Sequence, residues 1–396
     1  MKLRRDRVSA AEELDVVIVN QVPSTCLVEL AAALGKRGHR VRLVTGAPVA
    51  TRAMQNVVSV PLVDYDPQTA FGRLRSWLSF TILAARYLLG VRADAVVVTC
   101  TNPPTMPFVT VAVSAIRRFA VIVRVLDVYP DVLRAVPFPG WRLVGWVYGA
   151  VNRWTYARCA VVMTLGATMA ETLSKYVGRS NIHVIPEWVS PACEVPGERD
   201  GGFESPVVVI ASGNVGATHD NTPLLAAAER MRGEPIRFLI STKNSSRLPP
   251  ALAEARNVEV YPHLPEDDYL RLLDSADVAF VSQREFAESC SFPSRVLTYL
   301  SHALPVLATS GHRSDLAALL DQQGCGIVVS PNDADEGVIN ALGRLCADPR
   351  LLEAMRCAAG KASHLFARSI WLPKFVNLVE QAGAEHRLAA GIGHDA

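Results

Sequence analysis

The chain has 396 residues, of which 50% are hydrophobic and 20% are charged, and its formal net charge is +2. This length favours two domains, and the composition is that of a globular chain, which excludes intrinsic disorder. The charge is close to neutral and both signs are mixed along the sequence, so nothing indicates a nucleic-acid-binding surface.

Neither the cysteines nor the first residues indicate secretion. The 8 cysteines are scattered without a CxxC pair or a Cys/His zinc spacing, which fits reduced thiols. The start, MKLRRDRVSAAEELD, is basic but has no apolar core, so we expect no signal peptide. The longest apolar run, WLSFTILAARYLLGV, falls short of the roughly 20 residues that span a bilayer. We therefore expect a cytoplasmic protein.

The first half alternates short β-branched runs with helical segments. Strands are predicted at 15–20, 39–45, 94–100, 119–127 and 159–165. Continuous apolar strands separated by helices are typical of a parallel sheet that is covered on both faces. The pattern predicts a doubly wound α/β domain over residues 1–190.

One helical segment of this half, FGRLRSWLSFTILAARYLLGVR at 71–92, is unusually apolar and carries Arg73, Arg75, Arg86 and Arg92. Such a helix can lie on a membrane surface with its apolar face down and its arginines near anionic head groups. It can equally pack on the sheet while its arginines reach out to water. The sequence leaves both interpretations open.

Two loops of the first half directly follow predicted strands. LDVYPD places Asp127 at the end of one strand, where the carboxylate either caps a turn or belongs to an active site. TNPPT, at 101–105, ends another strand, and its two prolines favour a rigid loop. We expect both loops to line a cleft.

The stretch SPACEVPGERDGGFES interrupts the alternation with Pro, Gly, Ser and charges, which predicts a linker over 191–205. Beyond it the alternation resumes and predicts a second doubly wound domain over 206–365. Ligands of such sheets bind beyond the carboxyl ends of the strands. Strands are predicted here at 207–214, 236–242, 258–264, 278–282, 305–309 and 326–330.

The loop after the first of these strands, SGNVGATHD, contains Gly213 and Gly216, which permit a tight turn and a close backbone approach to a ligand. His219 and Asp220 add polar contacts. An ordinary strand-to-helix turn explains the same residues, because a G-x-x-G pattern alone is weak.

Two further loops supply positive charge after neighbouring strands. STKNSSRL carries Lys243 and Arg247, and FPSRVLTYLS carries Ser294 and Arg295 at a predicted helix start. Singly, these are solvated cations or a helix cap. Together with the glycine turn they match what a diphosphate needs, namely backbone N–H groups, cations and a helix dipole.

With these motifs the chain resembles the family 4 retaining glycosyltransferases of the GT-B fold, especially the bacterial group that builds surface polysaccharides and O-antigens. The resemblance runs from about residue 14 to 382 and rests on SGNVGATHD, LPEDDYLRLLDSADVAFV, FPSRVLTYLSHALPVLAT and CGIVVSPND, with LDVYPDVL and IPEWVSP. It implies two Rossmann-like, doubly wound parallel-sheet domains facing a cleft, with a C-terminal helix within 366–396 that returns to the first domain.

The resemblance also implies an activity. The enzyme would be a hexosyl- or N-acetylhexosaminyltransferase that moves a sugar from a UDP-linked donor to a lipid-linked or polysaccharide acceptor, with retention of configuration. It would need no cofactor and no metal, and it would work in the cytoplasm, with a peripheral contact to an anionic membrane. Two alternatives stay open: a nucleotide-sugar epimerase of the same fold, and a catalytically silent partner subunit.

The family pattern assigns expected roles to individual residues. The donor would be bound by Gly213, Asn214, Gly216 and His219, and its diphosphate by Lys243 or Arg247 together with Ser294 and Arg295. Asp127 would be the catalytic residue facing the reacting sugar, and Thr101 and Asn102 would lie on the acceptor side.

Some positions depart from the family pattern. The family commonly carries two glutamates eight residues apart, the second of which holds the ribose hydroxyls. Thr298 stands at the second position and Cys290 at the first, while Glu288 lies two residues earlier. Ala217 replaces a common basic residue, and the 20–26 loop lacks the usual glycine pair. We place Glu288 and Thr298 among the donor-side residues and expect the changes to affect donor affinity and nucleotide choice.

Overall fold

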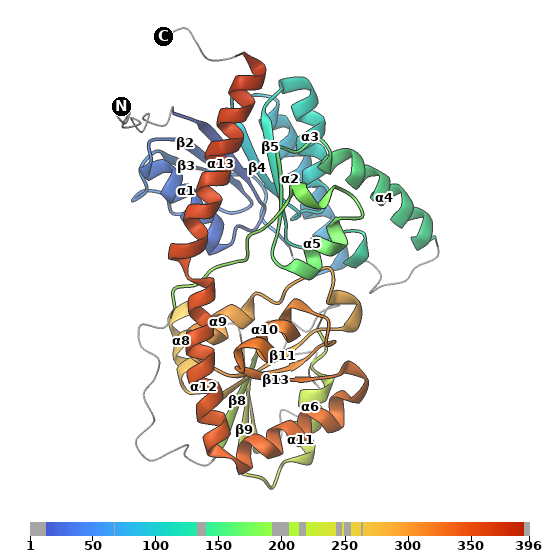
Figure 1. Cartoon of the computed structure of the whole chain (residues 1–396), viewed down its shortest axis with the longest axis vertical. Helices are drawn as coiled ribbons and strands as arrows, with labels where there is room; N and C mark the ends of the chain where they lie inside the picture. The colour runs from blue at the N-terminus through green and yellow to red at the C-terminus, as the bar shows by residue number, and fades with distance from the viewer. Residues whose placement is uncertain are drawn as a thin grey trace, which may run out of the picture. The chain divides into compact units, whose positions relative to one another are not determined.

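The structure, a computed structural model, describes residues 13–66, 68–132, 140–191, 206–213, 219–242, 248, 255–262 and 264–391 (Figure 1). Its contacts divide the chain into two compact units. The first unit comprises Met1–Val125, Val151–Met163 and Leu372–Ala396, and the second comprises Leu126–Ala150 and Thr164–Trp371.

The first sheet has seven strands in the order β3-β2-β1-β4-β5-β6-β7, and the pairs from β3 to β5 run parallel. The central strands β1, β4 and β5 are buried along their whole length, because their sequences are apolar toward both faces. The strands are β1 (Asp15–Val19), β2 (Arg40–Thr45), β3 (Val57–Pro61), β4 (Val96–Cys100), β5 (Ala120–Val125), β6 (Val161–Thr164) and β7 (Ile182–Val184).

The five strands predicted for the first half are confirmed as β1, β2, β4, β5 and β6. The edge strands β3 and β7 were not predicted. Both are largely exposed or half-buried, so they lack the continuous apolar run that identified the other strands. The helices that accompany this half are α1 (Thr25–Lys36), α2 (Ala70–Leu88), α3 (Met106–Arg117), α4 (Trp141–Tyr156) and α5 (Ala167–Leu173).

The second sheet has six strands in the order β10-β9-β8-β11-β12-β13, all paired in parallel. All six were predicted. They are β8 (Val207–Ser212), β9 (Ile236–Ser241), β10 (Val258–Tyr261), β11 (Val278–Ser282), β12 (Val306–Thr309) and β13 (Gly326–Val329). The reversal of strand order at β8 and β11 is the arrangement of a doubly wound sheet, and it places the carboxyl ends of the strands at one edge.

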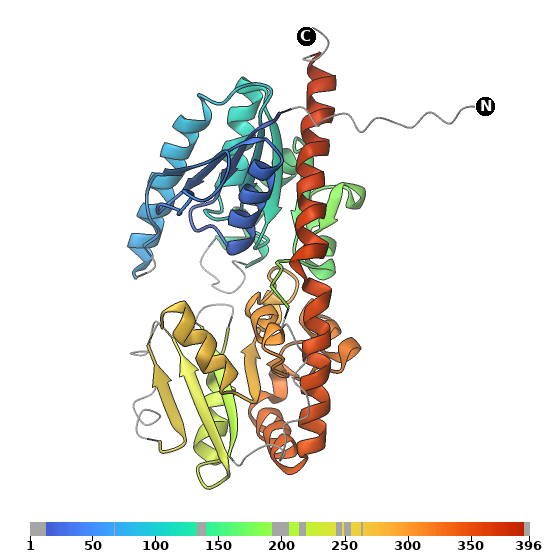
Figure 2. The ribbon, with the colours of Figure 1, turned by 90° about the vertical axis from the view of Figure 1, so that its left-hand side faces the viewer.

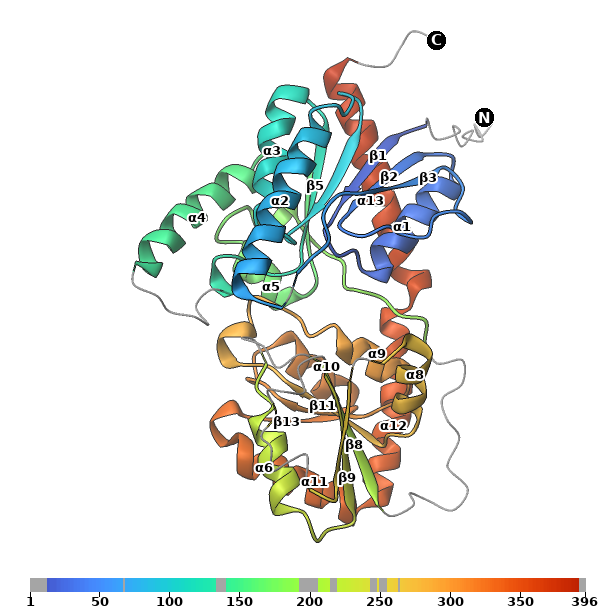
Figure 3. The ribbon, with the colours of Figure 1, turned by 180° about the vertical axis from the view of Figure 1, so that it is seen from behind.

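Helices cover both faces of the second sheet (Figure 3). One apolar core cluster joins the sheet to α6, α11 and the start of α12. The other joins it to α8, α9, α10 and the end of α12. The expected α/β class with two parallel, doubly wound sheets is therefore confirmed. The helices are α6 (Thr222–Arg230), α8 (Glu266–Asp274), α9 (Arg295–Ser301), α10 (Asp315–Gln323), α11 (Ala334–Ala347) and α12 (Pro349–Ser363).

The last helix, α13 (Arg368–Ala390), belongs to the first unit from Leu372 onward, as predicted (Figure 2). Its apolar side chains Phe375 and Val379 are fully buried. Glu380 accepts a hydrogen bond from Arg37 at 2.7 Å and lies 3.0 Å from the buried ring of His39. These two hydrogen bonds outweigh burial and hold the pKa of Glu380 below its usual value.

The ring of His39 links this helix to the first strand. Its Nδ1 accepts a hydrogen bond from the Leu14 N–H at 3.2 Å, so its Nε2 carries the proton that it donates to Glu380. Glu380→Ala would leave this buried N–H without an acceptor, and we expect a loss of about 1–3 kcal/mol in the free energy of unfolding. Urea unfolding measures it, with the exposed Glu385→Ala on the same helix as the control. Equal stability of the two variants would contradict this account.

The predicted domain limits, 1–190, 206–365 and 366–396, stay predictions. The linker predicted at 191–205 lies outside the described residues, apart from residue 191. None of the helices in the described ranges has the length and apolar character that crossing a membrane requires.

Candidate functional site

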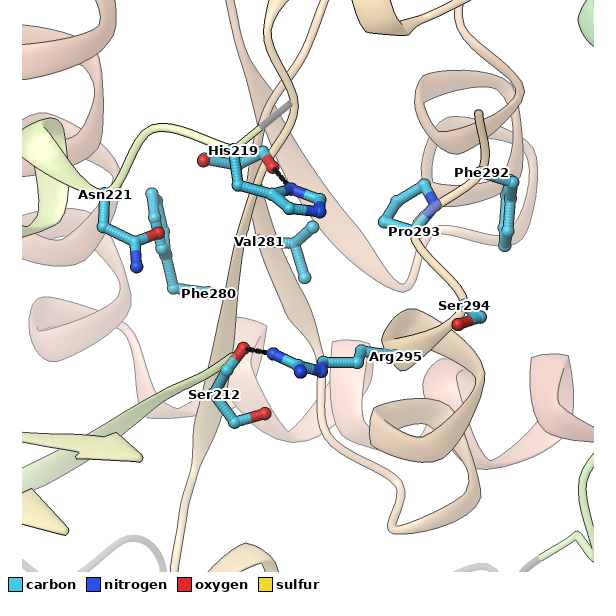
Figure 4. A pocket seen from close by; sticks show the side chains of 10 residues that line it. Ser212, His219, Asn221, Phe280, Val281, Phe292, Pro293, Ser294 and Arg295 are labelled. Atoms are coloured by element: carbon cyan, nitrogen blue, oxygen red, sulfur yellow. Dashed lines mark hydrogen bonds between the residues drawn. The ribbon is translucent and has the colours of Figure 1, made fainter. Parts of the chain in front are cut away.

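Two hollows open at the carboxyl edge of the second sheet. The first hollow, about 310 Å³, is bounded by Ser212, His219, Ser282, Pro293, Ser294 and Arg295, with Phe280 and Phe292 among its apolar walls (Figure 4). The second hollow, about 610 Å³, is bounded by Ser212, Gly213, Thr242, Glu266, Arg295 and Thr298. Ser212 and Arg295 line both hollows, so they stand where the two meet.

Arg295 begins α9 and reaches across to the end of β8, where its guanidinium donates a hydrogen bond to the carbonyl oxygen of Ser212 (Figure 4). Gly213 follows with a φ of +126°, and an added Cβ there would overlap the guanidinium. No carboxylate among the described residues forms an ion pair with Arg295. The guanidinium thus keeps donors available for an anion at the junction of the hollows.

Two tyrosines support the backbone at this junction. The hydroxyls of Tyr269 and Tyr299 both lie 2.7 Å from the Ser212 Oγ, and the Ser212 N–H donates to the Tyr299 hydroxyl at 3.0 Å. Burial raises the pKa of Tyr269, which keeps its hydroxyl protonated as a donor. Sequence reasoning missed both tyrosines, because α8 and α9 bring them to β8 only through tertiary packing.

His219 contributes a neutral ring to the first hollow (Figure 4). Its Nδ1 lies 2.5 Å from the carbonyl oxygen of Ser282, so Nδ1 carries the proton and Nε2 is left as an acceptor. Burial lowers the pKa of His219 below its usual value, and the positive charge of Arg295 lowers it further. The hydrogen bond to the Ser282 carbonyl acts in the opposite direction. The Asp220 N–H donates to the Ser282 Oγ at 2.5 Å, which fixes this segment on β11.

Asp127 lies beside the segment that leads into the first hollow. It pairs with Ser291 in an isolated antiparallel bridge, and the Val128 N–H donates to the Cys290 carbonyl at 2.8 Å. The Gln283 side chain holds the same segment through the Ser291 carbonyl at 2.9 Å. Asp127 keeps some accessible surface, yet the surrounding protein desolvates it and raises its pKa to about 6.

Glu288 lines neither hollow. Its carboxylate accepts a hydrogen bond from the Gly311 N–H, where an added Cβ would overlap it. Burial raises the pKa of Glu288 above its usual value, although the bond to Gly311 acts in the opposite direction.

Cys290 is completely buried, whereas Thr298 lines the second hollow. The carboxylates that the family pattern places at 290 and 298 are therefore absent from both positions.

The other predicted site residues fall in different places. Thr101 is buried in the first unit, and the carbonyl of Asn102 accepts a hydrogen bond from the Gln21 N–H at 3.2 Å. Asn214, Gly216, Lys243 and Arg247 lie outside the described residues. The described part of the chain holds no group of three His, Cys, Asp or Glu side chains suited to a metal ion.

Two family models together match most of the chain. Residues 23–188 match the glycosyl transferase 4-like domain, and residues 206–348 match the glycosyl transferases group 1. No curated protein matches the chain significantly.

Several solved structures share the fold at low sequence identity. WaaG, a glycosyltransferase involved in lipopolysaccharide biosynthesis, is 17% identical with a TM-score of 0.64, covering 92% of this chain and 99% of its own. Anabaena HepE in complex with UDP-glucose is 12% identical with a TM-score of 0.62, covering 96% and 100%. Sucrose-phosphate synthase from Thermosynechococcus elongatus is 14% identical with a TM-score of 0.66, covering 96% and 100%. The chain is thus a glycosyltransferase of the GT-B fold, with a glycosyl transferase 4-like first half and a group 1 second half.

Proposed function

We propose that the chain transfers a hexosyl or N-acetylhexosaminyl group from a UDP-linked donor to a lipid-linked or polysaccharide acceptor, with retention of configuration. The observation that carries this proposal is Arg295, a guanidinium without a carboxylate partner among the described residues, at the junction of two hollows. A diphosphate at that junction would meet the guanidinium directly, with the sugar and the nucleoside extending into the two hollows.

The solved relatives support the nucleotide and the acceptor class. HepE was crystallised with UDP and with UDP-glucose, and WaaG takes part in lipopolysaccharide biosynthesis. The comparisons give no support to an epimerase or to a silent subunit. The same relatives support the proposal that the enzyme takes part in polysaccharide assembly at the cell envelope.

The residues of the site suit the breaking of the bond between the anomeric carbon and the diphosphate oxygen. Negative charge grows on the leaving diphosphate, and Arg295 would stabilise it, aided by Lys243 or Arg247 as predicted. The Nε2 of His219 would accept a hydrogen bond from a sugar hydroxyl in the first hollow. Because these cations supply the positive charge, the proposal needs no metal ion.

A thermal-shift panel of nucleotide sugars tests the donor proposal. We expect UDP-sugars to raise the melting temperature more than GDP- or ADP-sugars, since a ligand at 100 times its Kd adds about 2.7 kcal/mol of stability. A protein that no nucleotide stabilises would contradict the proposal.

Gly213→Ala tests the arrangement at the end of β8. The φ of +126° disfavours alanine, and the new Cβ would displace the Arg295 guanidinium. We expect UDP to bind at least about tenfold more weakly, as for the loss of a charged hydrogen bond. Calorimetry with UDP gives the measurement, and Gly343→Ala in α11, where a Cβ would meet open space, is the control. Equal Kd values for both variants would show that Arg295 does not depend on this glycine.

We further propose that the first unit binds the anionic inner face of the cell membrane through α2. The helix packs inward through Phe80, which is fully buried. Its outward face is also apolar, with Phe71, Leu74, Leu78 and Ile82 exposed by 74%, 63%, 59% and 58%. These residues recur at intervals of three or four, so they form one stripe along the helix.

The charge around this stripe favours a lipid surface. Residues 70–92 contain Arg73, Arg75, Arg86 and Arg92 and no acidic residue. An apolar stripe flanked by arginines matches the boundary between acyl chains and anionic head groups. On this proposal, the two interpretations of 71–92 describe different faces of one helix.

Sedimentation with vesicles of an anionic phospholipid tests this contact. Leu78→Glu and the pair Arg73→Glu with Arg75→Glu should each lower the bound fraction at least about fivefold, because each removes apolar contact or basic charge. Leu388→Glu on α13, also at an exposed leucine, is the control. Absence of binding at low salt, or binding that survives the arginine replacements, would contradict the proposal.

A further inference from the structure

The two hollows differ in ways that distinguish the two ends of a nucleotide sugar. The second hollow is about 610 Å³ and the first about 310 Å³. The wall of the second includes Leu264 and Pro265, which offer apolar contact to a flat base, beside the polar Ser241 and Thr242. The first presents the acceptor Nε2 of His219, which suits a sugar hydroxyl.

One face of α8 places Glu266 in the wall of the second hollow. Tyr269 of α8 is fixed toward the end of β8 by its 2.7 Å contact with Ser212. Glu266 lies three residues before Tyr269, so it shares that face, and it lines the same hollow. It is the single acidic side chain in that wall among the described residues, since Asp267 lies outside it and Asp268 pairs with Arg271.

We propose that the second hollow holds the nucleoside of the donor and that the Glu266 carboxylate accepts hydrogen bonds from the two ribose hydroxyls. This assignment rests on the proposed function. In this assignment the carboxylate that binds the ribose comes from α8. The helix α9 contributes Thr298 to the same hollow, and this side chain has no carboxylate.

The chemistry of the carboxylate supports this choice of partner. An ionised carboxylate only accepts hydrogen bonds, and its two oxygens match two neighbouring hydroxyl donors. It repels the diphosphate, so it favours binding only where it faces a neutral donor group. The vicinal hydroxyls of ribose are such donors in a nucleoside diphosphate. The Thr298 hydroxyl in the same hollow can accept as well, but neutral hydrogen bonds are weaker.

The test compares each ribonucleoside diphosphate with its 2′-deoxy counterpart by calorimetry on the full chain. We use UDP, GDP and ADP with their deoxy forms. For the tightest binder, we expect the wild-type chain to prefer the ribose form at least about tenfold, as for a hydrogen bond to a charged acceptor. In Glu266→Ala the preference should fall close to one. The ribose form then loses both contacts with the carboxylate, whereas the 2′-deoxy form loses only the contact made by its 3′-hydroxyl.

Asp267→Ala is the matched control, because it removes the same charge from the next residue of the same helix but not from the hollow. It should keep the wild-type preference. If UDP binds and Glu266→Ala keeps the preference, the assignment of Glu266 is wrong and the proposed function stands. If no nucleoside diphosphate binds, both are overturned.

Discussion

Arg295→Ala should weaken UDP binding by about 1.5–3 kcal/mol, which is roughly ten- to 150-fold in Kd, and lower sugar transfer by at least as much. The guanidinium stands where the two hollows meet, and the negative charge on the diphosphate grows as its bond to the sugar breaks. Its effect on the transition state should therefore exceed its effect on binding. Calorimetry and initial rates give the two values.

Arg271→Ala is the control for this variant. Arg271 lies in α8, exposed and paired with Asp268, and lines neither hollow. It should leave both the UDP affinity and the rate unchanged. If Arg295→Ala bound UDP with wild-type affinity, the proposal would be wrong and the start of α9 would have only a structural role.

Asp127→Asn should lower turnover at least about 100-fold, the usual range for loss of a catalytic carboxylate, while it keeps the size of the side chain. At neutral pH the same substitution should increase the free energy of unfolding. Burial raises the pKa of Asp127 from an ordinary 3.8 to about 6 in the folded chain. The folded state therefore holds this proton more tightly than the unfolded state does.

That contribution to stability is complete below about pH 4 and is lost as the pH rises through 6, which costs roughly 3 kcal/mol. Asparagine does not titrate. We expect Asp127→Asn to match the wild-type chain in stability near pH 4 and to exceed it at pH 8. Urea unfolding at the two pH values gives the measurement.

Asp131→Asn is a control in the same segment. Asp131 is buried, accepts a hydrogen bond from the Tyr176 hydroxyl at 2.7 Å and lies 3.9 Å from the Lys175 ammonium. Removal of its charge should therefore lower stability but keep turnover. Turnover that survives in Asp127→Asn, together with lower stability at pH 8, would make Asp127 a structural residue.

The sequence predicted the five inner strands of the first sheet and all six strands of the second. The inner strands were found because burial on both faces leaves a continuous apolar run. The sequence did not predict β3 or β7, whose positions at the edges leave several side chains exposed and remove that signal. The helix α13 was expected from the family pattern, but its bonds to His39 and Arg37 join residues more than 300 positions apart and have no local signature.

The candidate site shows the same limit. Arg295 and His219 follow strand ends, where the sequence alone identifies polar loops. Glu266 and Tyr269 reach the second hollow from the start of a helix whose sequence, within LPEDDYLRLLDSADVAFV, served only as a motif of the family resemblance. Tertiary packing therefore decides their role. Glu288 was placed on the donor side by its position in the chain, whereas its carboxylate is held by the Gly311 N–H.

Release of UDP from a UDP-sugar, measured with and without a lipid extract of the source cells, tests the central claim most directly. We predict that one of a panel of UDP-sugars yields free UDP only when the extract is present, and that Arg295→Ala lowers the rate of this release at least about tenfold. Conversion of the UDP-sugar into another sugar nucleotide without the extract, or saturable binding with no UDP released, would contradict a transferase.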